Sequence, residues 1–303
     1  MAGTTLAIVH DDCLPDHDVH GPQVSDDQEA ATTARPRPSF DIHAANRPLV
    51  MGVLNVTPDS FSDGGQFADP EVAIRQARRM AAEGADILDI GAESTRPGHK
   101  PISADEELAR LLPILSSVVA LGLPVSVDTM KAKVAEACLS QGVGIINDVW
   151  GLQHDPDMAG LVARHDVPLI IMHNRTAADP TIDILADIEA FFARSLRLAE
   201  SAGVKRERII LDPGIGFGKT PEQSIQTLAH LDRVKRFGLP MLIGLSRKRF
   251  IASVSPSESH ERLAGSIAAN VLAVQAGAAI IRVHDVAETV QALRVVAAIE
   301  QAR

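Results

Sequence analysis

Eight short apolar runs, each followed by a polar or glycine-rich turn and then by an amphipathic segment, repeat through residues 47–303. The runs begin near Leu49, Asp86, Pro124, Val143, Pro168, Arg208, Pro240 and Ala279. Strands that alternate with helices pair in parallel through right-handed crossovers. Eight such units match the usual size of a (β/α)8 TIM barrel, and an open doubly wound sheet is the alternative. We therefore expect residues 41–303 to form one α/β barrel domain.

Two of the amphipathic segments carry helix signals at their start. Asp69 precedes Pro70, so we expect an N-cap followed by a first-turn proline. Asp285 is expected to cap the last helix. Apolar residues then recur at helical spacing, namely Ala73, Ala77, Met80 and Ala81 in the first segment and Val286, Val290, Leu293 and Ala297 in the second.

Residues 1–40 show no strand or helix periodicity and are polar, acidic and turn-prone. We expect a flexible, disordered acidic N-terminal extension. His10, His17 and His20 lie among aspartates in this segment. We interpret this segment as a solvated tail and not as a metal site, because nothing holds these side chains in place as ligands.

The overall charge and the cysteines exclude several classes of function. A net charge of -10 disfavours nucleic acid or an anionic membrane surface as a partner. Cys13 and Cys138 cannot form a disulfide framework, and Cys138 is expected to be a plain core residue. No apolar run is long enough to span a bilayer, and no Lys or Arg precedes Arg35 as a signal peptide would require. A cytoplasmic location is the expectation.

Mostly polar side chains follow every predicted strand. In a barrel the carboxyl ends of the strands converge on one mouth, so these residues define the candidate site. They are Asn55 with the loop from Thr57 to Gly65, Glu93 to Pro97, Asp128, Thr129, Asn147, Asp148, Met172, His173, Asn174, Asp212, Ser246, Arg247, Lys248, Arg282, His284 and Asp285. Singly, Asp89 or Asp128 could be a polar residue of the barrel core, and His173 a satisfied core histidine. Burying many such groups together costs several kcal/mol each if unpaired, which favours a ligand site.

The glycines at 214, 216 and 218, followed by Lys219 and Thr220, do not form a known nucleotide motif. The first glycine of a P-loop would fall at Pro213, and the third glycine of a dinucleotide fingerprint would fall at Lys219. His173 and His284 are too few for a zinc cage. The loop is either a tight turn or a surface for a flat ligand, and Phe217 favours the second.

The chemistry at the strand ends is of two kinds. Donors suited to phosphate oxygens are Arg96, Lys248, Arg282 and His284. Groups suited to a planar nitrogen heterocycle rich in N–H donors are Asp128, Asn147 and Asp212. Asn55 can present a neutral oxygen to Mg2+, which would otherwise keep water and phosphate ligands.

The strand-end segments resemble the bacterial dihydropteroate synthase family from about Pro48 to the C-terminus. They occur in the order GVLNVTPDSFSDGG, DIGAESTRPG, SVDT, IINDV, LDPGIGFGK, GLSRK and RVHD. The resemblance implies a homodimeric folate-biosynthesis transferase that joins 6-hydroxymethyl-7,8-dihydropterin diphosphate to p-aminobenzoate, with Mg2+ as cofactor and sulfonamides as competitors. The mechanism implied is a dissociative substitution.

The resemblance also implies a role for each matching residue. The pterin would be held by Thr95, Asp128, Asn147, Asp212 and Lys248. The diphosphate would be held by Asn55, Arg96, Arg282 and His284, with Asn55 also contacting the metal. The p-aminobenzoate pocket would contain Phe61, Thr95, Pro97, Phe217 and Ser246, and the catalytic set would be Asp128, Lys248, Arg282 and His284. His99 and Lys100 depart from the small or apolar residues expected there.

Two alternatives share the pterin pocket. A pterin-binding methyltransferase that serves a corrinoid protein should lack the long first and second loops and the phosphate-binding Lys248, Arg282 and His284. A catalytically silent paralogue would usually lose the loop motifs, which are intact in residues 57–65 and 94–98.

Overall fold

A computed structural model describes residues 40–57, 69–93 and 101–303. Within them, eight parallel strands form one sheet in the order β6-β5-β4-β3-β2-β1-β8-β7. The strands are β1 (Leu49–Asn55), β2 (Ile87–Gly91), β3 (Val125–Asp128), β4 (Ile145–Asp148), β5 (Leu169–Met172), β6 (Ile209–Asp212), β7 (Leu242–Gly244) and β8 (Ile280–Val283). The ends of this order meet where Leu211 N–H donates to the Pro240 carbonyl at 2.9 Å, beside a parallel bridge to Met241. The predicted (β/α)8 TIM barrel is confirmed.

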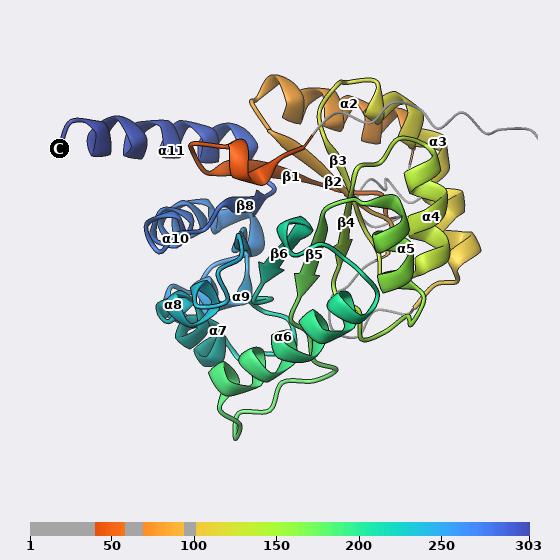
Figure 1. Ribbon diagram of the computed structural model, residues 1–303. Coiled ribbons are helices and arrows are strands. Elements are labelled where there is room, and N and C mark those ends of the chain that lie inside the picture. Colours follow the sequence, from red (N-terminus) through yellow and green to blue (C-terminus); the bar gives the residue numbers. More distant parts are fainter. Residues whose placement is uncertain (1–39, 58–68, 94–100) are drawn as a thin grey trace, which may run out of the picture. The chain divides into compact units, whose positions relative to one another are not determined.

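Helices follow the strands and surround the sheet (Figure 1). They are α2 (Pro70–Ala82), α3 (Ala104–Val119), α4 (Ala132–Ser140), α5 (Met158–His165), α6 (Ile184–Ser201), α7 (Pro221–Ala229), α8 (Leu231–Lys235), α9 (Arg249–Val254), α10 (Leu263–Gln275) and α11 (Val286–Gln301). Short 3-10 turns are η1 (Ile42–Ala44), η2 (Arg206–Arg208) and η3 (Ser259–Glu261).

The strands present two different faces because their side chains alternate. One set packs against the helices, and the other fills the barrel interior. At the amino ends of the strands the interior is apolar and is covered by η1; its residues are Ile42, Met51, Ile87, Ile145, Ile170, Ile210, Leu242 and Ile280. Burying each such side chain fully stabilises the fold by about 1.5–3 kcal/mol. The next inward positions, two residues further on, are mostly polar and face the carboxyl ends.

One of the two predicted helix caps is wrong. Asp69 caps α2 as expected, because its side chain accepts a hydrogen bond from Glu71 N–H at 2.9 Å. Asp285 stands before α11 but its carboxylate makes no capping hydrogen bond. It binds the Arg247 guanidinium instead, with Nε at 3.0 Å from Oδ2. A partner distant in sequence has replaced the local one.

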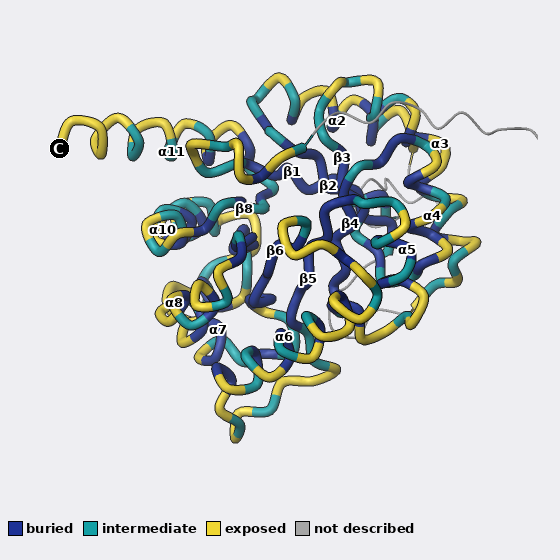
Figure 2. Tube along the Cα trace, viewed as in Figure 1, coloured by how far each residue is buried: buried dark blue, intermediate teal, exposed yellow. Residues whose placement is uncertain are grey.

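Burial follows the barrel plan (Figure 2), and the strands are mostly buried, whereas α11 is exposed along much of its length. Cys138 on α4 is fully buried, as expected for a core residue, and burial raises the pKa of its thiol to about 12. Among the described residues, none of the helices combines the length and the hydrophobicity that a membrane-spanning helix requires. The domain boundary at residue 40 stays a prediction, because residues 1–39 lie outside the described part.

Candidate active site

The inward polar positions of five strands form a group that we call the polar layer: Asp89, Asp128, Asn147, Asp212 and Arg282. Arg282 of β8 reaches across the barrel interior. Its Nε donates to Asp89 Oδ2 at 2.6 Å, and its Nη2 donates to Asp128 Oδ2 at 2.8 Å. Asn147 Nδ2 donates to the same Asp89 oxygen at 3.1 Å. One guanidinium therefore links β8 to β2 and β3, although β1 lies between β8 and β2 in the sheet.

The polar layer keeps open hydrogen-bonding capacity. Asp89 Oδ1 and Asn147 Oδ1 are buried and accept no hydrogen bond from any residue that the structure describes. A buried acceptor left unpaired costs about 1–3 kcal/mol. N–H donors of a ligand that entered the barrel mouth would satisfy both oxygens, so the layer suits a nitrogen heterocycle.

The electrostatics of the polar layer favour a ligand that is positively charged or rich in N–H donors. Burial raises the pKa of Asp128 to about 7, although the Arg282 charge opposes this rise and nearby carboxylates add to it. Burial disfavours the Arg282 cation, but Asp89 and Asp128 outweigh burial and keep its pKa above the usual value. Two carboxylates share one fixed cation, and this leaves excess negative charge.

Lys248 and the glycine-rich loop, residues 214–218, form the neighbouring wall. Asp212 Oδ1 accepts a hydrogen bond from Gly214 N–H at 2.8 Å, and burial raises the pKa of Asp212. Lys248 Nζ donates to the Ile215 carbonyl and lies 4.7 Å from the centroid of the Phe217 ring. Burial lowers the pKa of Lys248 to about 8 despite the opposing charge of Asp212.

Ser246 and His284 meet between β7 and β8. The His284 backbone N–H lies 3.3 Å from Ser246 Oγ, and His284 Nδ1 lies 3.0 Å from the same oxygen. The intervening turn is fixed because Arg247 has a φ of 60° and its N–H donates to Ser266 Oγ at 2.9 Å. Arg262 Nη1 donates to the Arg247 carbonyl at 3.0 Å. This turn sets Ser246 toward β8 and Lys248 toward the glycine-rich loop.

The structure thus gathers most of the predicted site residues at one end of the barrel. Asp128, Asn147 and Arg282 share one network, and Asp212, Lys248 and Phe217 lie at the glycine-rich loop. Asn55 ends β1, half-buried, in register with Gly91 of β2. The other predicted residues lie outside the described part: Phe61, Thr95, Arg96 and Pro97.

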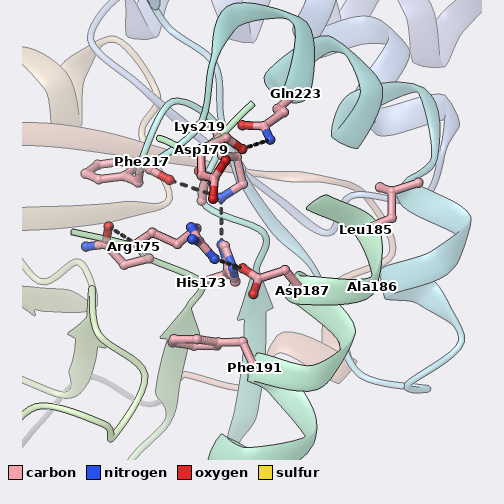
Figure 3. A network of polar contacts seen from close by, with 12 residues as sticks. His173, Arg175, Asp179, Leu185, Ala186, Asp187, Phe191, Phe217, Lys219 and Gln223 are labelled. Atoms are coloured by element: carbon pink, nitrogen blue, oxygen red, sulfur yellow. Dashed lines mark hydrogen bonds and ion pairs between the residues drawn. The ribbon is translucent and has the colours of Figure 1, made fainter. Parts of the chain in front are cut away.

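Sequence reasoning left out two contributors to this end of the barrel. The sequence indicates Asp89 only as a possible core residue, yet it binds both Arg282 and Asn147. The available signal was a charged residue in the middle of an otherwise apolar strand. Lys219 enters the sequence argument only beside a glycine pattern that matches no nucleotide motif, but it is buried and its Nζ lies 2.6 Å from His173 Nδ1 (Figure 3). The interpretation of His173 as a satisfied core histidine is confirmed, because it is fully buried and also binds Asp187.

Comparisons with known proteins agree with this geometry. A family described as pterin binding enzyme matches residues 51–284. The dihydropteroate synthase of Bacillus subtilis is 46% identical over 239 residues, which cover 78% of this chain and 84% of the relative.

Solved structures give the same result. The Xanthomonas albilineans dihydropteroate synthase with 4-aminobenzoic acid is 47% identical, with a TM-score of 0.81, and the match covers 84% of this chain and 94% of that one. The Clostridium difficile dihydropteroate synthase in the presence of pteroic acid is 48% identical, with a TM-score of 0.80, and the match covers 84% of this chain and 97% of that one. This chain therefore belongs to the dihydropteroate synthase family, whose members are transferases.

Proposed function

We propose that this protein condenses 6-hydroxymethyl-7,8-dihydropterin diphosphate with p-aminobenzoate to give 7,8-dihydropteroate and diphosphate, as a cytoplasmic step of folate biosynthesis. The observation that carries the proposal is the polar layer, with two buried acceptor oxygens that no described residue satisfies. A pterin ring has the N–H donors that these oxygens lack. The relatives solved with 4-aminobenzoic acid and in the presence of pteroic acid support this assignment.

The pterin is assigned to the polar layer and its neighbour Lys248. Asn147 and Asp89 offer acceptors, and Asp128 and Asp212 add carboxylates at the ends of β3 and β6. Lys248 can donate to a ring nitrogen or carbonyl while it remains over Phe217. Each hydrogen bond that involves a charged group is worth about 1.5–3 kcal/mol. Thr95 is assigned to the pterin only through the family resemblance.

The diphosphate is assigned to Asn55, Arg282 and His284, with Arg96 from outside the described part. Two nitrogens of Arg282 bind carboxylates, so its third, Nη1, is the one assigned to a phosphate oxygen. Asn55 fits Mg2+, since this ion needs only one or two protein oxygens beside water and phosphate. The described residues contain no cluster of three or more His, Cys, Asp or Glu side chains that could hold a metal. Bound there, Mg2+ would neutralise charge on the departing diphosphate.

The aromatic amine is assigned to Phe217 and Ser246, with Phe61, Thr95 and Pro97 outside the described part. The Phe217 ring is half-buried and can pack against a flat ring, and Ser246 Oγ can donate to a carboxylate. Because sulfonamides resemble p-aminobenzoate, they are expected to compete for this pocket.

The chemistry proposed is a dissociative substitution. The bond between the exocyclic methylene and the diphosphate oxygen breaks, and its electron pair leaves with the diphosphate. Positive charge grows on the methylene and spreads into the pterin, where the carboxylate of Asp128 stabilises it. The amine nitrogen then forms the new C–N bond and loses a proton. An aromatic amine needs no strong base for this step.

Turnover of the purified protein tests the proposal. With Mg2+, the pterin diphosphate and p-aminobenzoate present, diphosphate release should require the amine, and 7,8-dihydropteroate should form in equal amount. Reactions that omit the amine or the protein are the controls. Absence of dihydropteroate from a folded sample that binds the pterin would contradict the proposal.

The pH profile of kcat/KM for the pterin diphosphate should be bell-shaped. Asp128 acts as a carboxylate, so activity should be lost as the pH falls through about 7. Lys248 acts as a cation, so activity should be lost as the pH rises through about 8. The Asp128→Asn variant should lose the acid limb and Lys248→Met the alkaline limb, whereas limbs that stay in both variants would belong to the substrate.

A homodimer is proposed for the assembly, and the surface of α10 and α11 supports it. Leu272, Val295 and Ile299 are 60%, 55% and 54% exposed there. Sedimentation should give a dimer mass for the wild type, and Leu272→Glu should shift it toward the monomer.

A further inference from the structure

Lys219 directly follows the glycine-rich loop, and its ammonium group lies inside the protein. Its exposed fraction is 7%, and its Nζ donates to the Gly214 carbonyl at 2.8 Å and to the Phe217 carbonyl at 3.2 Å. The third partner is His173 Nδ1 at 2.6 Å (Figure 3). All three hydrogen-bonding positions of the ammonium are thus used within the protein.

His173 continues this chain of contacts toward α6. Its Nε2 lies 3.0 Å from Asp187 Oδ2, and Arg175 Nη1 donates to the same oxygen at 2.9 Å. The imidazole is fully buried and meets the Phe191 ring edge-on, with the centroids 4.9 Å apart. Its orientation is therefore fixed by packing as well as by hydrogen bonds.

Lys219 Nζ and His173 Nδ1 share one proton. Every hydrogen bond of the two side chains is made whichever nitrogen carries that proton. A charged lysine can donate to the neutral Nδ1, or a neutral lysine can accept from a charged imidazole. In both arrangements the lysine donates to the two carbonyls and Nε2–H donates to Asp187. Burial lowers the pKa of Lys219, and burial and the nearby lysine charge lower the pKa of His173 to about 3, so a second proton is disfavoured. The pair therefore holds at most one positive charge, either on the lysine or on the imidazole that contacts Asp187.

The loop itself lies directly against the segment after β5. A Cβ atom at Gly214 would fall 1.9 Å from the His173 carbonyl oxygen, and one at Gly218 would fall 2.4 Å from Arg175 Cβ. Both glycines also have positive φ values, 64° and 54°. The loop and the end of β5 therefore form one packed unit, with the Lys219 and His173 contact inside it.

The position of the loop controls two contacts at the candidate site. The Ile215 carbonyl accepts a hydrogen bond from Lys248, and the Phe217 ring lies beneath the same ammonium. If the loop moved outward, Phe217 would move with it, and Lys248 would lose both partners. The pterin would keep its contacts to Asp128 and Asn147, which are on other strands.

We propose that Lys219 and His173 form a positioning pair that holds the glycine-rich loop, and with it Phe217, in the place where the aromatic amine binds. The identity of that amine, p-aminobenzoate, rests on the proposed function. Neither residue of the pair touches a substrate. Their effect is specific for one of the two substrates, because the loop contributes Phe217 to one pocket and only supports Lys248 in the other.

Lys219→Met tests the pair, because methionine keeps the apolar stem and removes the three donors. The KM for p-aminobenzoate should rise by about tenfold or more, and by several times more than the KM for the pterin diphosphate. Lys219→Arg, which keeps a donor cation, should recover part of this loss. Lys205→Met is the matched control. Lys205 precedes β6, at the opposite end of that strand from Lys219, and forms an ion pair with Asp166. The KM values of this variant should stay at the wild-type level.

Hydrogen exchange of the backbone amides gives a readout that needs no turnover. Gly214 N–H is bound by Asp212 and Phe217 N–H by the Gly214 carbonyl, and both should exchange about tenfold faster or more in Lys219→Met. If this variant does not fold, His173→Gln removes the lysine's partner and should give the same two effects. Unchanged amide exchange and an unchanged KM for p-aminobenzoate in a folded variant would overturn the proposal. Should the wild type form no dihydropteroate, the proposed function fails, and the exchange rates still decide whether the pair holds the loop.

Discussion

Asp128→Asn is expected to lower kcat by roughly 100- to 1000-fold, the size of effect seen when one preorganised group that stabilises a transition-state charge is removed. Asparagine keeps the shape and a carbonyl oxygen that can still accept the hydrogen bond from Arg282 Nη2. It removes the negative charge that faces the developing cation on the pterin methylene. The dissociation constant for the pterin diphosphate should therefore change much less than kcat.

Steady-state kinetics and pterin binding, both measured on the same preparation, check this result. Asp166→Asn is the matched control, because Asp166 forms ion pairs with Lys205 and Arg208 and has a side chain that is 41% exposed. The control should keep the wild-type kcat. Equal losses in kcat and in binding for Asp128→Asn would mean that Asp128 only binds the ground state.

The architecture could be predicted because its determinants are local. Each strand is a short apolar run, and each strand of the structure begins within two residues of the predicted start. The cap at Asp69 and the proline at 70 lie next to the helix that they start. Alternation of strands and helices then leaves few possible topologies, and the count of eight strand–helix units favours the barrel.

The partners within the site could not be predicted because they are remote in sequence. Arg282 and Asp89 are 193 residues apart, and no spacing rule links them. Asp285 is a second example of a remote partner. Its position next to a helix indicates a cap, but Arg247, 38 residues earlier, binds its carboxylate. Which strand ends carry polar residues could be predicted, but which of these residues bind one another required the folded barrel.

Lys219 illustrates a third case, in which a motif test was correct but incomplete. The spacing of the glycines does exclude a phosphate-binding loop. It does not indicate that the Lys219 side chain points into the protein, where it binds His173 and two carbonyls of the glycine-rich loop. That contact depends on the close approach of the loop to the segment after β5, where Gly214 and Gly218 leave room. The glycines can be recognised in the sequence, but the segment against which they pack is known only from the folded structure.

The second large effect is expected for Arg282→Met, which should lower the free energy of unfolding by about 3–5 kcal/mol, because one partner of a buried ion pair is removed. The side chains of Asp89 and Asp128 are 0% and 11% exposed, so water cannot replace the lost cation at Asp89. Arg47→Met is the matched control. It breaks an Arg–Asp pair of similar hydrogen-bond geometry, but Arg47 has a side chain that is 57% exposed, and a cost of about 0–1 kcal/mol is expected.

Urea unfolding of both variants measures the difference, and a second substitution identifies its cause. If the loss in Arg282→Met comes from uncompensated carboxylates, adding Asp89→Asn should recover part of the stability. The loss should also shrink as the pH falls, because Asp128 no longer has the Arg282 charge that lowers its pKa and takes up a proton more readily. Equal stability losses in Arg282→Met and Arg47→Met, with no recovery in the double variant, would mean that the charges of the polar layer do not depend on Arg282 for their balance.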